Sequence, residues 1–221
     1  MDYFKYVDYT CLKADASMRD IEALCNEAMK YHCASVCVNP YYVRLAHELT
    51  KDSTTVVTCV VGFPLGATST KVKALEAIEA IEDGASEIDL VINIGALKNK
   101  DYEYIKEEIE EIRDSIDGKT LKVIVETCYL NEAELKKMVE ICNETFVSFI
   151  KTSTGYGTRG VSLKDIDIIN KYKEEFLEIK ASGGIRDIEM VNNLLDRGVT
   201  RLGMSNIDCL KGSKEWNYMK I

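Results

Sequence analysis

The segment from residue 147 to residue 160 contains the residue types that amine chemistry requires. Its first five residues, Val-Ser-Phe-Ile-Lys, predict a short buried strand that ends on a cation, Lys151. A turn rich in glycine and hydroxyl residues follows, with Gly155, Gly157 and Gly160. A lysine on a rigid strand, beside a loop that can bind an anion, indicates amine chemistry on a phosphorylated substrate. The alternative, which this segment leaves open, is that Lys151 caps a strand and the glycines only turn the chain.

Two further charged residues interrupt apolar segments. Asp89 lies in the run at 86–93, and Lys180 lies in the run at 177–181. Because unpaired buried charges are costly, these residues must be paired or perform chemistry. Two neighbouring ammonium groups disfavour double protonation, so one amine is expected to be neutral and able to form a Schiff base with an aldehyde or ketone. Asp89 would then relay protons to the substrate hydroxyl. A buried Asp–Lys salt bridge without turnover is the competing interpretation.

Predicted strands and helices alternate along the whole chain. The predicted strands cover 4–10, 34–38, 55–61, 86–93, 121–126, 147–151, 177–181 and 201–204. Helices are expected to begin near Ser17, Pro40, Ser69, Asp101, Asn131, Ser162 and Asp187, with a last short segment opened by Ser205-Asn206-Ile207. In the helix after Ser69, Leu75 and Ile78 are expected to face inward.

This alternation in 221 residues predicts an α/β fold in which residues 1–221 form a single (β/α)8 TIM barrel domain. A doubly wound open sheet is the alternative. That fold would have fewer strands and a Gly-x-Gly-x-x-Gly turn after the first strand, and this turn is absent.

In such a barrel the functional site lies where the strands end. Polar and small residues gather at these predicted ends: Asp8, Thr10, Asn39, Gly62, Glu126, Ser182, Gly203 and Ser205. Gly155, Gly183, Gly184 and Ser205 follow the last three strands, where backbone N–H groups commonly bind phosphate. Arg186 would add a charge-assisted contact. For any single glycine, a simple role in turning the chain remains open.

Composition narrows the function classes. The net charge is −9 and the pI is about 4.9, without the basic excess of a nucleic-acid binder. No apolar run approaches the ~20 residues of a membrane span. The eight cysteines form no Cys-x-x-Cys pair and no zinc-like spacing, so no metal site is expected. The N-terminus also lacks the apolar core of a signal peptide, and we expect a cytoplasmic protein with reduced thiols.

Several motifs together resemble the deoxyribose-phosphate aldolases, a family of class I aldolases, nearly end to end. They are Asp8-Tyr9-Thr10-Cys11-Leu12-Lys13, Val36-Cys37-Val38-Asn39-Pro40, Val61-Gly62-Phe63-Pro64-Leu65-Gly66, the segment 87–97 around Asp89, Glu126-Thr127-Cys128, the segment 149–155 around Lys151, and the segment 180–186 around Lys180.

The resemblance implies a reaction and residue roles. Lys151 would form the Schiff base, Lys180 would tune it and assist proton transfer, and Asp89 would relay protons. The reaction would be the reversible cleavage of 2-deoxy-D-ribose 5-phosphate to acetaldehyde and D-glyceraldehyde 3-phosphate in deoxynucleoside breakdown. The resemblance implies a homodimer, and it implies neither a metal nor an organic cofactor. The implied substrate-binding residues are Thr10, Cys37, Thr152, Gly155, Gly183, Gly184, Arg186, Gly203, Ser205 and Asn206.

The segment 203–207 departs from the family pattern. It is Gly-Met-Ser-Asn-Ile here, where the family often has Gly-Thr-Ser-Ser-Gly. Because Ile207 has less access to positive φ than glycine, we expect weaker phosphate binding with the chemistry retained. Tyr218, near the end of the chain, is a further candidate to reach the site, as C-terminal tyrosines do in relatives. Cys37 is a candidate to react with aldehydes.

Two other functions compete with this one. One is a different Schiff-base aldolase acting on another aldose phosphate. The other is a non-catalytic sugar-phosphate binder, which should have lost at least one of Lys151, Lys180 and Asp89.

Overall fold

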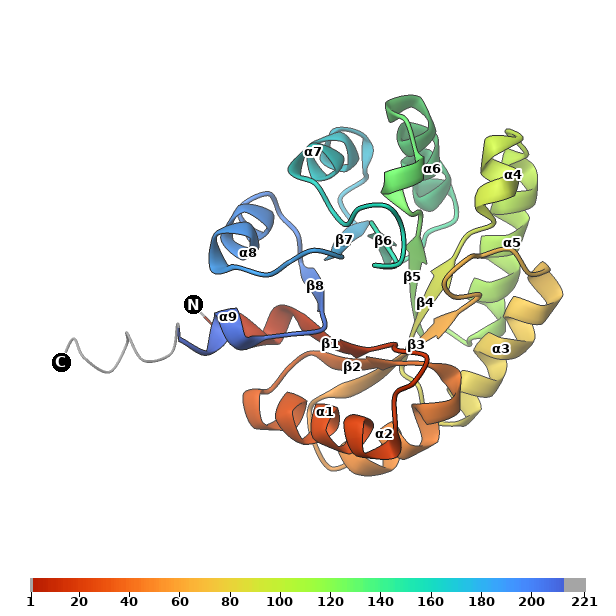
Figure 1. Ribbon diagram of the computed structural model, residues 1–221. Coiled ribbons are helices and arrows are strands. Elements are labelled where there is room, and N and C mark those ends of the chain that lie inside the picture. The colour runs from red at the N-terminus through yellow and green to blue at the C-terminus, as the bar shows by residue number, and fades with distance from the viewer. Residues whose placement is uncertain (1, 213–221) are drawn as a thin grey trace.

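Eight parallel strands close into a barrel. The computed structural model describes residues 2–212, and each strand pairs with the next until β8 returns to β1 (Figure 1). The strands are β1 Val7–Cys11, β2 Ser35–Val38, β3 Val56–Val61, β4 Glu87–Val91, β5 Thr120–Ile124, β6 Phe149–Lys151, β7 Glu178–Ser182 and β8 Arg201–Met204. The predicted TIM barrel is confirmed, and the open sheet is excluded because β1 and β8 are hydrogen-bonded.

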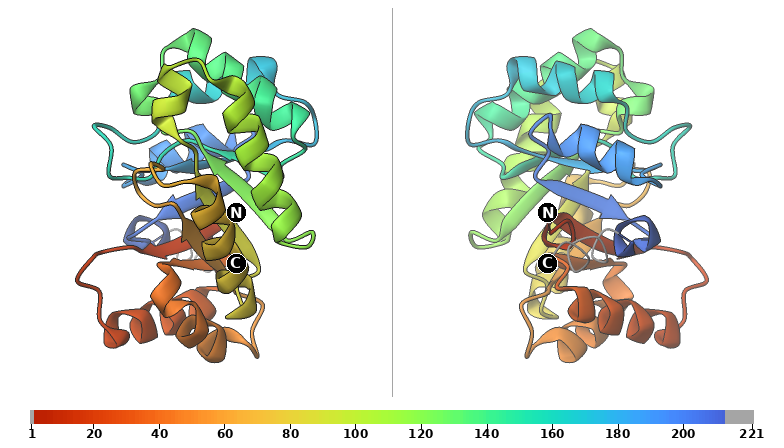
Figure 2. Two further views of the ribbon diagram at one scale, coloured as in Figure 1. Left: turned by 90° about the vertical axis from the view of Figure 1, so that its right-hand side faces the viewer. Right: turned by 90° about the vertical axis from the view of Figure 1, so that its left-hand side faces the viewer.

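Helices surround the strands on the outside. The side views show α1 and α2 on the opposite side of the strands from α6 and α7 (Figure 2). The helices are α1 Met18–Tyr31, α2 Val43–Thr50, α3 Thr70–Glu82, α4 Ile94–Lys98, α5 Tyr102–Ser115, α6 Glu132–Glu144, α7 Leu163–Tyr172, α8 Ile188–Leu195 and α9 Asp208–Lys211.

Polar side chains fix where several of these helices begin. Capping boxes join Ser17 to Asp20 at α1, Asn131 to Glu134 at α6, and Ser162 to Asp165 at α7. In each, two otherwise unpaired backbone N–H groups gain an acceptor. These starts agree with the predicted ones.

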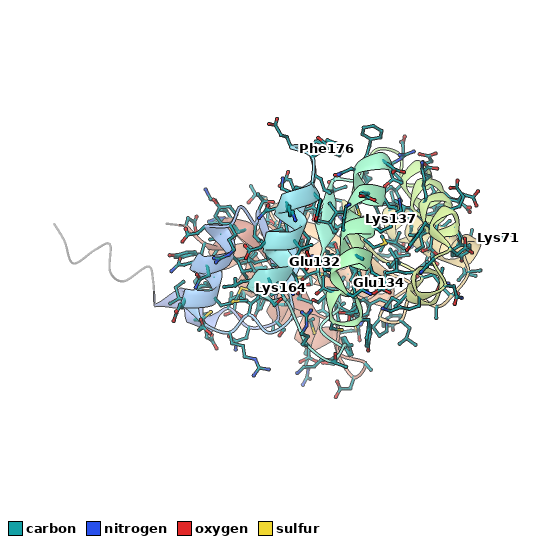
Figure 3. All side chains as sticks on the ribbon, turned by 90° about the horizontal axis from the view of Figure 1, so that it is seen from above. Lys71, Glu132, Glu134, Lys137, Lys164 and Phe176 are labelled. Carbon is teal, nitrogen blue, oxygen red and sulfur yellow. The ribbon has the colours of Figure 1, made fainter. Side chains whose placement is uncertain are left out.

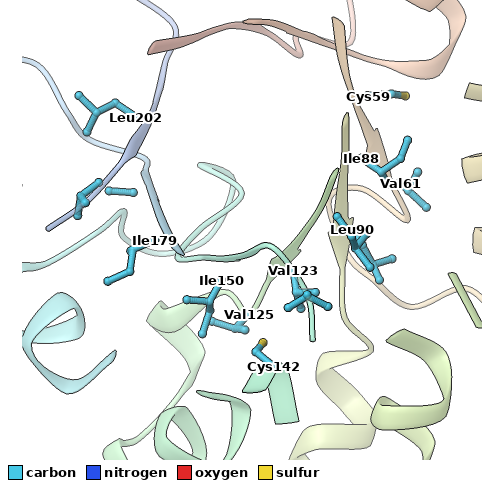
Figure 4. Close-up of a cluster of buried hydrophobic side chains, with 14 of the residues drawn as sticks. Cys59, Val61, Ile88, Leu90, Val123, Val125, Cys142, Ile150, Ile179 and Leu202 are labelled. Carbon is cyan, nitrogen blue, oxygen red and sulfur yellow. The ribbon is translucent and has the colours of Figure 1, made fainter. Parts of the chain in front are cut away.

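The hydrophobic core lies between the barrel and its helices. Alternate strand residues point outward, and Ile88, Leu90, Val123 and Ile150 are fully buried in one continuous cluster (Figure 4). The opposite, inward positions of the same strands therefore do not supply the main apolar core, and they are free to carry polar groups.

Several predicted boundaries differ from the observed ones. Phe4–Tyr6 form a 3-10 helix, so β1 begins at Val7. A helix does begin at Pro40, as predicted, but its first turn, Pro40–Tyr42, is 3-10 and α2 begins at Val43. The predicted strand at 86–93 ends at Val91, because Asn93 caps the short helix α4, which was not predicted. The last helix begins at Asp208, beyond the predicted Ser205-Asn206-Ile207 start.

The inward face of α3 was also predicted incorrectly. Leu75 is 57% exposed and Ile78 is only partly buried, whereas Lys73 is fully buried beside small alanines. The Lys73 ammonium lies 2.7 Å from the Glu108 carboxylate of α5 and donates to the Val91 carbonyl. This ion pair takes the place that a hydrophobic residue was expected to fill, and it fixes the end of β4.

Charged side chains cover the outer surface of the helices. Glu132, Lys137 and Lys164 lie on α6 and α7 and point away from the barrel (Figure 3). Within residues 2–212, no helix is both long enough and apolar enough to cross a membrane.

Replacing Lys73 tests the buried pair. Lys73→Met leaves the Glu108 carboxylate buried without its cation, so the free energy of unfolding should fall by about 3–5 kcal/mol, measured by urea denaturation. The double variant Lys73→Met/Glu108→Leu should recover much of this loss. A single variant as stable as wild type would show that the pair is not needed.

Candidate active site

The three predicted catalytic residues meet inside the barrel. Lys151 of β6 and Lys180 of β7 are register partners, and Asp89 reaches them from β4. The same Asp89 oxygen, Oδ2, lies 2.7 Å from Lys151 Nζ and 2.6 Å from Lys180 Nζ. All three side chains are almost fully buried.

Four more charged residues extend this cluster toward the floor of the barrel, the end where the strands begin. They are Asp8, Glu87, Lys122 and Arg201. Lys122 Nζ lies 3.0 Å from Asp89 and 2.6 Å from Glu87, and Lys180 Nζ lies 2.5 Å from Asp8. The three carboxylates are thus shared among four cations, and each buried charge has an opposite partner.

Arg201 closes the cluster from below. Its guanidinium contacts Asp8 at 2.6 Å and Glu87 at 3.0 Å and 3.1 Å. The hydroxyls of Ser35 and Thr58 donate to Asp8 and Glu87, at 2.7 Å and 2.9 Å. Of these four residues, only Asp8 was predicted from the sequence to lie at the site. Lys122 is a single cation within the apolar run 121–125, just as Lys180 is within 177–181, so the same pattern could have identified it.

The two lysines at Asp89 differ in protonation. Burial lowers the pKa of Lys151 below its ordinary value, and Lys180 adds to this effect against the attraction of Asp89. Burial alone would also lower the pKa of Lys180, but Asp8 and Asp89 outweigh it, so that pKa is raised. Lys180 therefore stays an ammonium, and Lys151 is the amine that can be neutral.

The carboxylates stay ionised for the complementary reason. Burial would raise the pKa of Asp89, but Lys122, Lys151 and Lys180 hold that pKa well below its ordinary value. The pKa of Asp8 is lowered in the same way, with Lys180, Lys122 and Arg201 outweighing burial. Asp89 is therefore an ionised carboxylate that accepts hydrogen bonds from both lysines.

A cavity of about 830 Å³ opens above Lys151. Its wall includes eight of the predicted substrate-binding residues, namely Thr10, Gly155, Gly183, Gly184, Arg186, Gly203, Ser205 and Asn206. Gly183 has φ +81°, a conformation that favours glycine. A Cβ on Gly160 would lie only 2.0 Å from the Gly183 carbonyl oxygen, so that position requires glycine as well. The predicted cluster of glycines after strands 6 to 8 is brought together at one side of the cavity.

Two predicted substrate-binding residues do not line this cavity. Thr152 is buried behind it, and its hydroxyl accepts from the Ser182 N–H at 3.1 Å, which ties the end of β6 to that of β7. Cys37 is fully buried, with its Sγ 3.9 Å from Asp89 Oδ2. Both residues support the site from behind.

The cavity has an unpredicted wall on the side of β1 and β3. Tyr156 lines it, donates to the Leu12 carbonyl at 2.7 Å and contacts Phe63 edge to face. The loop that carries it is anchored where Thr154 N–H donates to the buried Glu126 carboxylate. Phe63 and Glu126 lie in the motifs 61–66 and 126–128, but the sequence did not predict that either residue contacts the 154–156 loop.

The segment after β8 differs from the expected arrangement. Ile207 has φ −114° and packs in the core, so the position does not require the left-handed conformation that glycine would favour. The Asn206 side chain is bonded to Asp208, which itself lines the cavity. The conformation of Ile207 gives no support to the expected handicap, and weaker phosphate binding stays a prediction. Asp208, which pairs with Lys211 at 2.5 Å, adds a carboxylate beside the cavity.

Two further expectations concern a metal ion and the end of the chain. Among residues 2–212, no group of three or more His, Cys, Asp or Glu side chains is arranged to hold a metal ion. Tyr218 lies outside the residues that the structure describes.

Cys37 should be slow to react. Burial raises the pKa of its thiol to about 11, so the thiolate is scarce at neutral pH. Iodoacetamide at pH 7.5 should label the partly exposed Cys11, Cys128 and Cys209 first, as judged by peptide mass spectrometry. Labelling of Cys37 in the folded protein at the rate of Cys209 would contradict this expectation.

Known proteins match the chain over nearly its full length. A family model for DeoC/LacD family aldolases matches residues 4–205. A deoxyribose-phosphate aldolase from Finegoldia magna is 48% identical over 206 residues, which cover 93% of this chain and 97% of the relative. One from Thermococcus gammatolerans is 47% identical over 210 residues, covering 93% of both chains.

Solved structures agree with these sequence matches. The aldolase QR15 is 40% identical, covers both chains completely and superposes with a TM-score of 0.95. The deoxyribose phosphate aldolase from Aeropyrum pernix, described as tetrameric, is 26% identical with a TM-score of 0.88, covering 97% of this chain and 91% of its own. On the extent of these matches, the chain belongs to the DeoC/LacD aldolase family.

Proposed function

We propose that this protein is a class I aldolase that reversibly cleaves 2-deoxy-D-ribose 5-phosphate to acetaldehyde and D-glyceraldehyde 3-phosphate. One observation carries the proposal: the Lys151 amine lies at the cavity and shares its single carboxylate oxygen with the Lys180 ammonium. The names of the relatives, 40–48% identical, support this substrate.

Lys151 is the proposed nucleophile. Its neutral amine attacks the C1 aldehyde of the open-chain sugar, and the resulting carbinolamine loses water to give a protonated imine. The Lys180 ammonium, 2.6 Å from Asp89, carries the proton that the departing hydroxyl needs, and the Asp89 carboxylate is placed to relay it. Because both groups are packed in ion pairs, they are positioned before the substrate arrives.

Cleavage then uses the imine as the electron sink. Asp89 accepts the proton of the C3 hydroxyl, the C2–C3 bond breaks, and its electron pair moves to the imine carbon–nitrogen system to form an enamine. D-glyceraldehyde 3-phosphate leaves as the first product. Protonation of C2 and addition of water release acetaldehyde and restore the free Lys151 amine, so water is neither gained nor lost overall.

The glycine turns are the proposed phosphate end of the site. Gly183, Gly184 and Ser205 present backbone groups on one side of the cavity, and Arg186 adds a positive charge there. A substrate with its phosphate at these turns has its aldehyde available to Lys151.

A substrate panel tests the reaction. Wild type should cleave 2-deoxy-D-ribose 5-phosphate well ahead of other aldose phosphates, with aldehyde release followed by a coupled reductase assay. Lys151→Met should reduce cleavage to background, while Lys137→Met, on the outer surface of α6, should leave it unchanged. Preference for another aldose phosphate would identify a different Schiff-base aldolase, and loss of Lys151 without effect would refute the proposal.

Lys180→Met should weaken catalysis through charge as well as proton transfer. Without this ammonium, Asp89 attracts a proton to Lys151 more strongly, so the pKa of Lys151 should rise. The value of kcat should fall by about 10²–10⁴-fold, and the acidic limb of the pH profile of kcat/KM should move to higher pH. An unshifted limb would show that Lys180 does not tune Lys151.

Asp208 should weaken phosphate binding. The residue is exposed and lines the cavity, so Asp208→Asn should lower KM for the phosphorylated substrate by about twofold to fivefold. The KM for unphosphorylated 2-deoxy-D-ribose should stay unchanged, and Asp114→Asn, on the far end of α5, serves as the matched control. Equal changes for both sugars would show that Asp208 does not act on the phosphate.

We further propose a cytoplasmic homodimer in which residues 1–221 act as a single domain. The free state of all eight cysteines supports the location.

A groove lined by Phe63, Pro64, Leu65, Val72 and Leu75 supports the dimer, because Leu65, Val72 and Leu75 are more than half exposed. Light scattering should give twice the chain mass, and Leu65→Glu/Leu75→Glu should give a monomer. A wild-type monomer would refute the dimer.

A further inference from the structure

Glu87 and Arg201 form an ion pair on the floor of the barrel, away from the cavity that Lys151 lines. The guanidinium contacts both Glu87 oxygens, at 3.0 Å and 3.1 Å, and its side chain is only 16% exposed. It also lies over the ring of Phe149. Neither Glu87 nor Arg201 lines the cavity, so neither contacts the substrate in the proposed reaction.

Short contacts nevertheless connect this floor to the reacting amine. Glu87 holds Lys122 at 2.6 Å, Lys122 holds Asp89 Oδ1 at 3.0 Å, and Asp89 Oδ2 holds Lys151 at 2.7 Å. A second connection runs from Arg201 through Asp8 to Lys180, with contacts of 2.6 Å and 2.5 Å. A charge added or removed at the floor is therefore felt at Lys151 through two short chains of paired groups.

The formal charges of this cluster do not cancel. Asp8, Glu87 and Asp89 carry three negative charges, while Lys122, Lys151, Lys180 and Arg201 would carry four positive ones. Arg201 cannot lose its proton. In a buried site the surplus is relieved most easily by one neutral amine.

The pairing pattern decides which amine that is. Lys122 contacts three carboxylates and Lys180 contacts two, whereas Lys151, among the described residues, contacts Asp89 alone. The groups facing Lys151 are Asp89 from β4, Lys180 from β7 and the neutral Cys37 thiol from β2. Of the three lysines, Lys151 therefore loses the least ion-pair stabilisation when it is deprotonated.

We propose that Glu87 and Arg201 are positioning residues that set the protonation state of Lys151 from the floor of the barrel. Arg201 supplies the positive charge that makes a neutral Lys151 favourable, and Glu87 limits how far that effect goes. This inference rests on the proposed Schiff-base function of Lys151 and adds two residues that the reaction itself does not touch.

Removing the two charges singly should move the pH profile in opposite directions. Arg201→Gln takes away the surplus positive charge, so Lys151 holds its proton more tightly and the acidic limb of kcat/KM moves to higher pH. Glu87→Gln adds to the surplus, and the limb moves to lower pH. Each shift should be about one pH unit, or about tenfold in rate on the acidic limb, of the order that a unit charge produces across a few contacts in a protein interior.

Charge-preserving and double variants separate electrostatics from packing. Arg201→Lys and Glu87→Asp keep the charges and should keep the wild-type profile within about 0.3 of a pH unit. The double variant Glu87→Gln/Arg201→Gln removes one charge of each sign and should return the limb close to wild type. Because the double variant leaves no unpaired charge between these two positions, it keeps the test available if a single variant does not fold.

The outcomes distinguish this inference from the proposed function. Opposite shifts in the single variants, cancelled in the double variant, would support it. If one single variant does not fold, the other decides by the direction of its shift: higher pH for Arg201→Gln, lower pH for Glu87→Gln. Shifts in the same direction, no shift in the folded single variants, or an equal shift in the charge-preserving variants would overturn it. A wild type that does not cleave 2-deoxy-D-ribose 5-phosphate would instead overturn the proposed function.

Discussion

The constraint that governs this protein is the burial of seven charged side chains inside a closed barrel. A TIM barrel is usually filled by branched apolar residues, and here the inward positions of six strands hold carboxylates, amines and a guanidinium. Each such charge is costly unless its partners are close and well oriented. Hydrophobic stabilisation must therefore come from the outward strand faces, where the apolar cluster between strands and helices is continuous.

The same constraint explains how the site is prepared for chemistry. The partners that make buried charges tolerable also fix their positions, so Lys151, Lys180 and Asp89 are held at hydrogen-bonding distance without a substrate. Because three carboxylates are shared among four cations, the two lysines Lys151 and Lys180 differ in how readily they lose a proton. Lys180 is locked as an ammonium by two carboxylates, while Lys151, at the cavity, has one shared oxygen. Structure and reactivity thus follow from one pairing pattern.

The sequence predicted the fold and the reacting centre because both leave a periodic signal. Charges at Asp89, Lys151 and Lys180 interrupt apolar strands, and capping residues mark several helix starts. Glu87 and Arg201 were missed because they lie at the first position of their strands, where a charged residue is ordinary. Leu75 was misplaced because Lys73, not a leucine, fills the inward face of α3. The hydrogen bond from Tyr156 to Leu12 joins positions 144 residues apart, which spacing cannot reveal.

Of the two lysines at Asp89, Lys151 lines the cavity and Lys180 does not, so we infer that Lys151 is the amine that bonds to the substrate. The most direct test is to reduce the protein with borohydride in the presence of 2-deoxy-D-ribose 5-phosphate and to locate the adduct by peptide mass spectrometry. We expect a reduced adduct on the peptide containing Lys151 and an unmodified Lys180. An adduct on Lys180, or no adduct on protein shown to be folded, would contradict it.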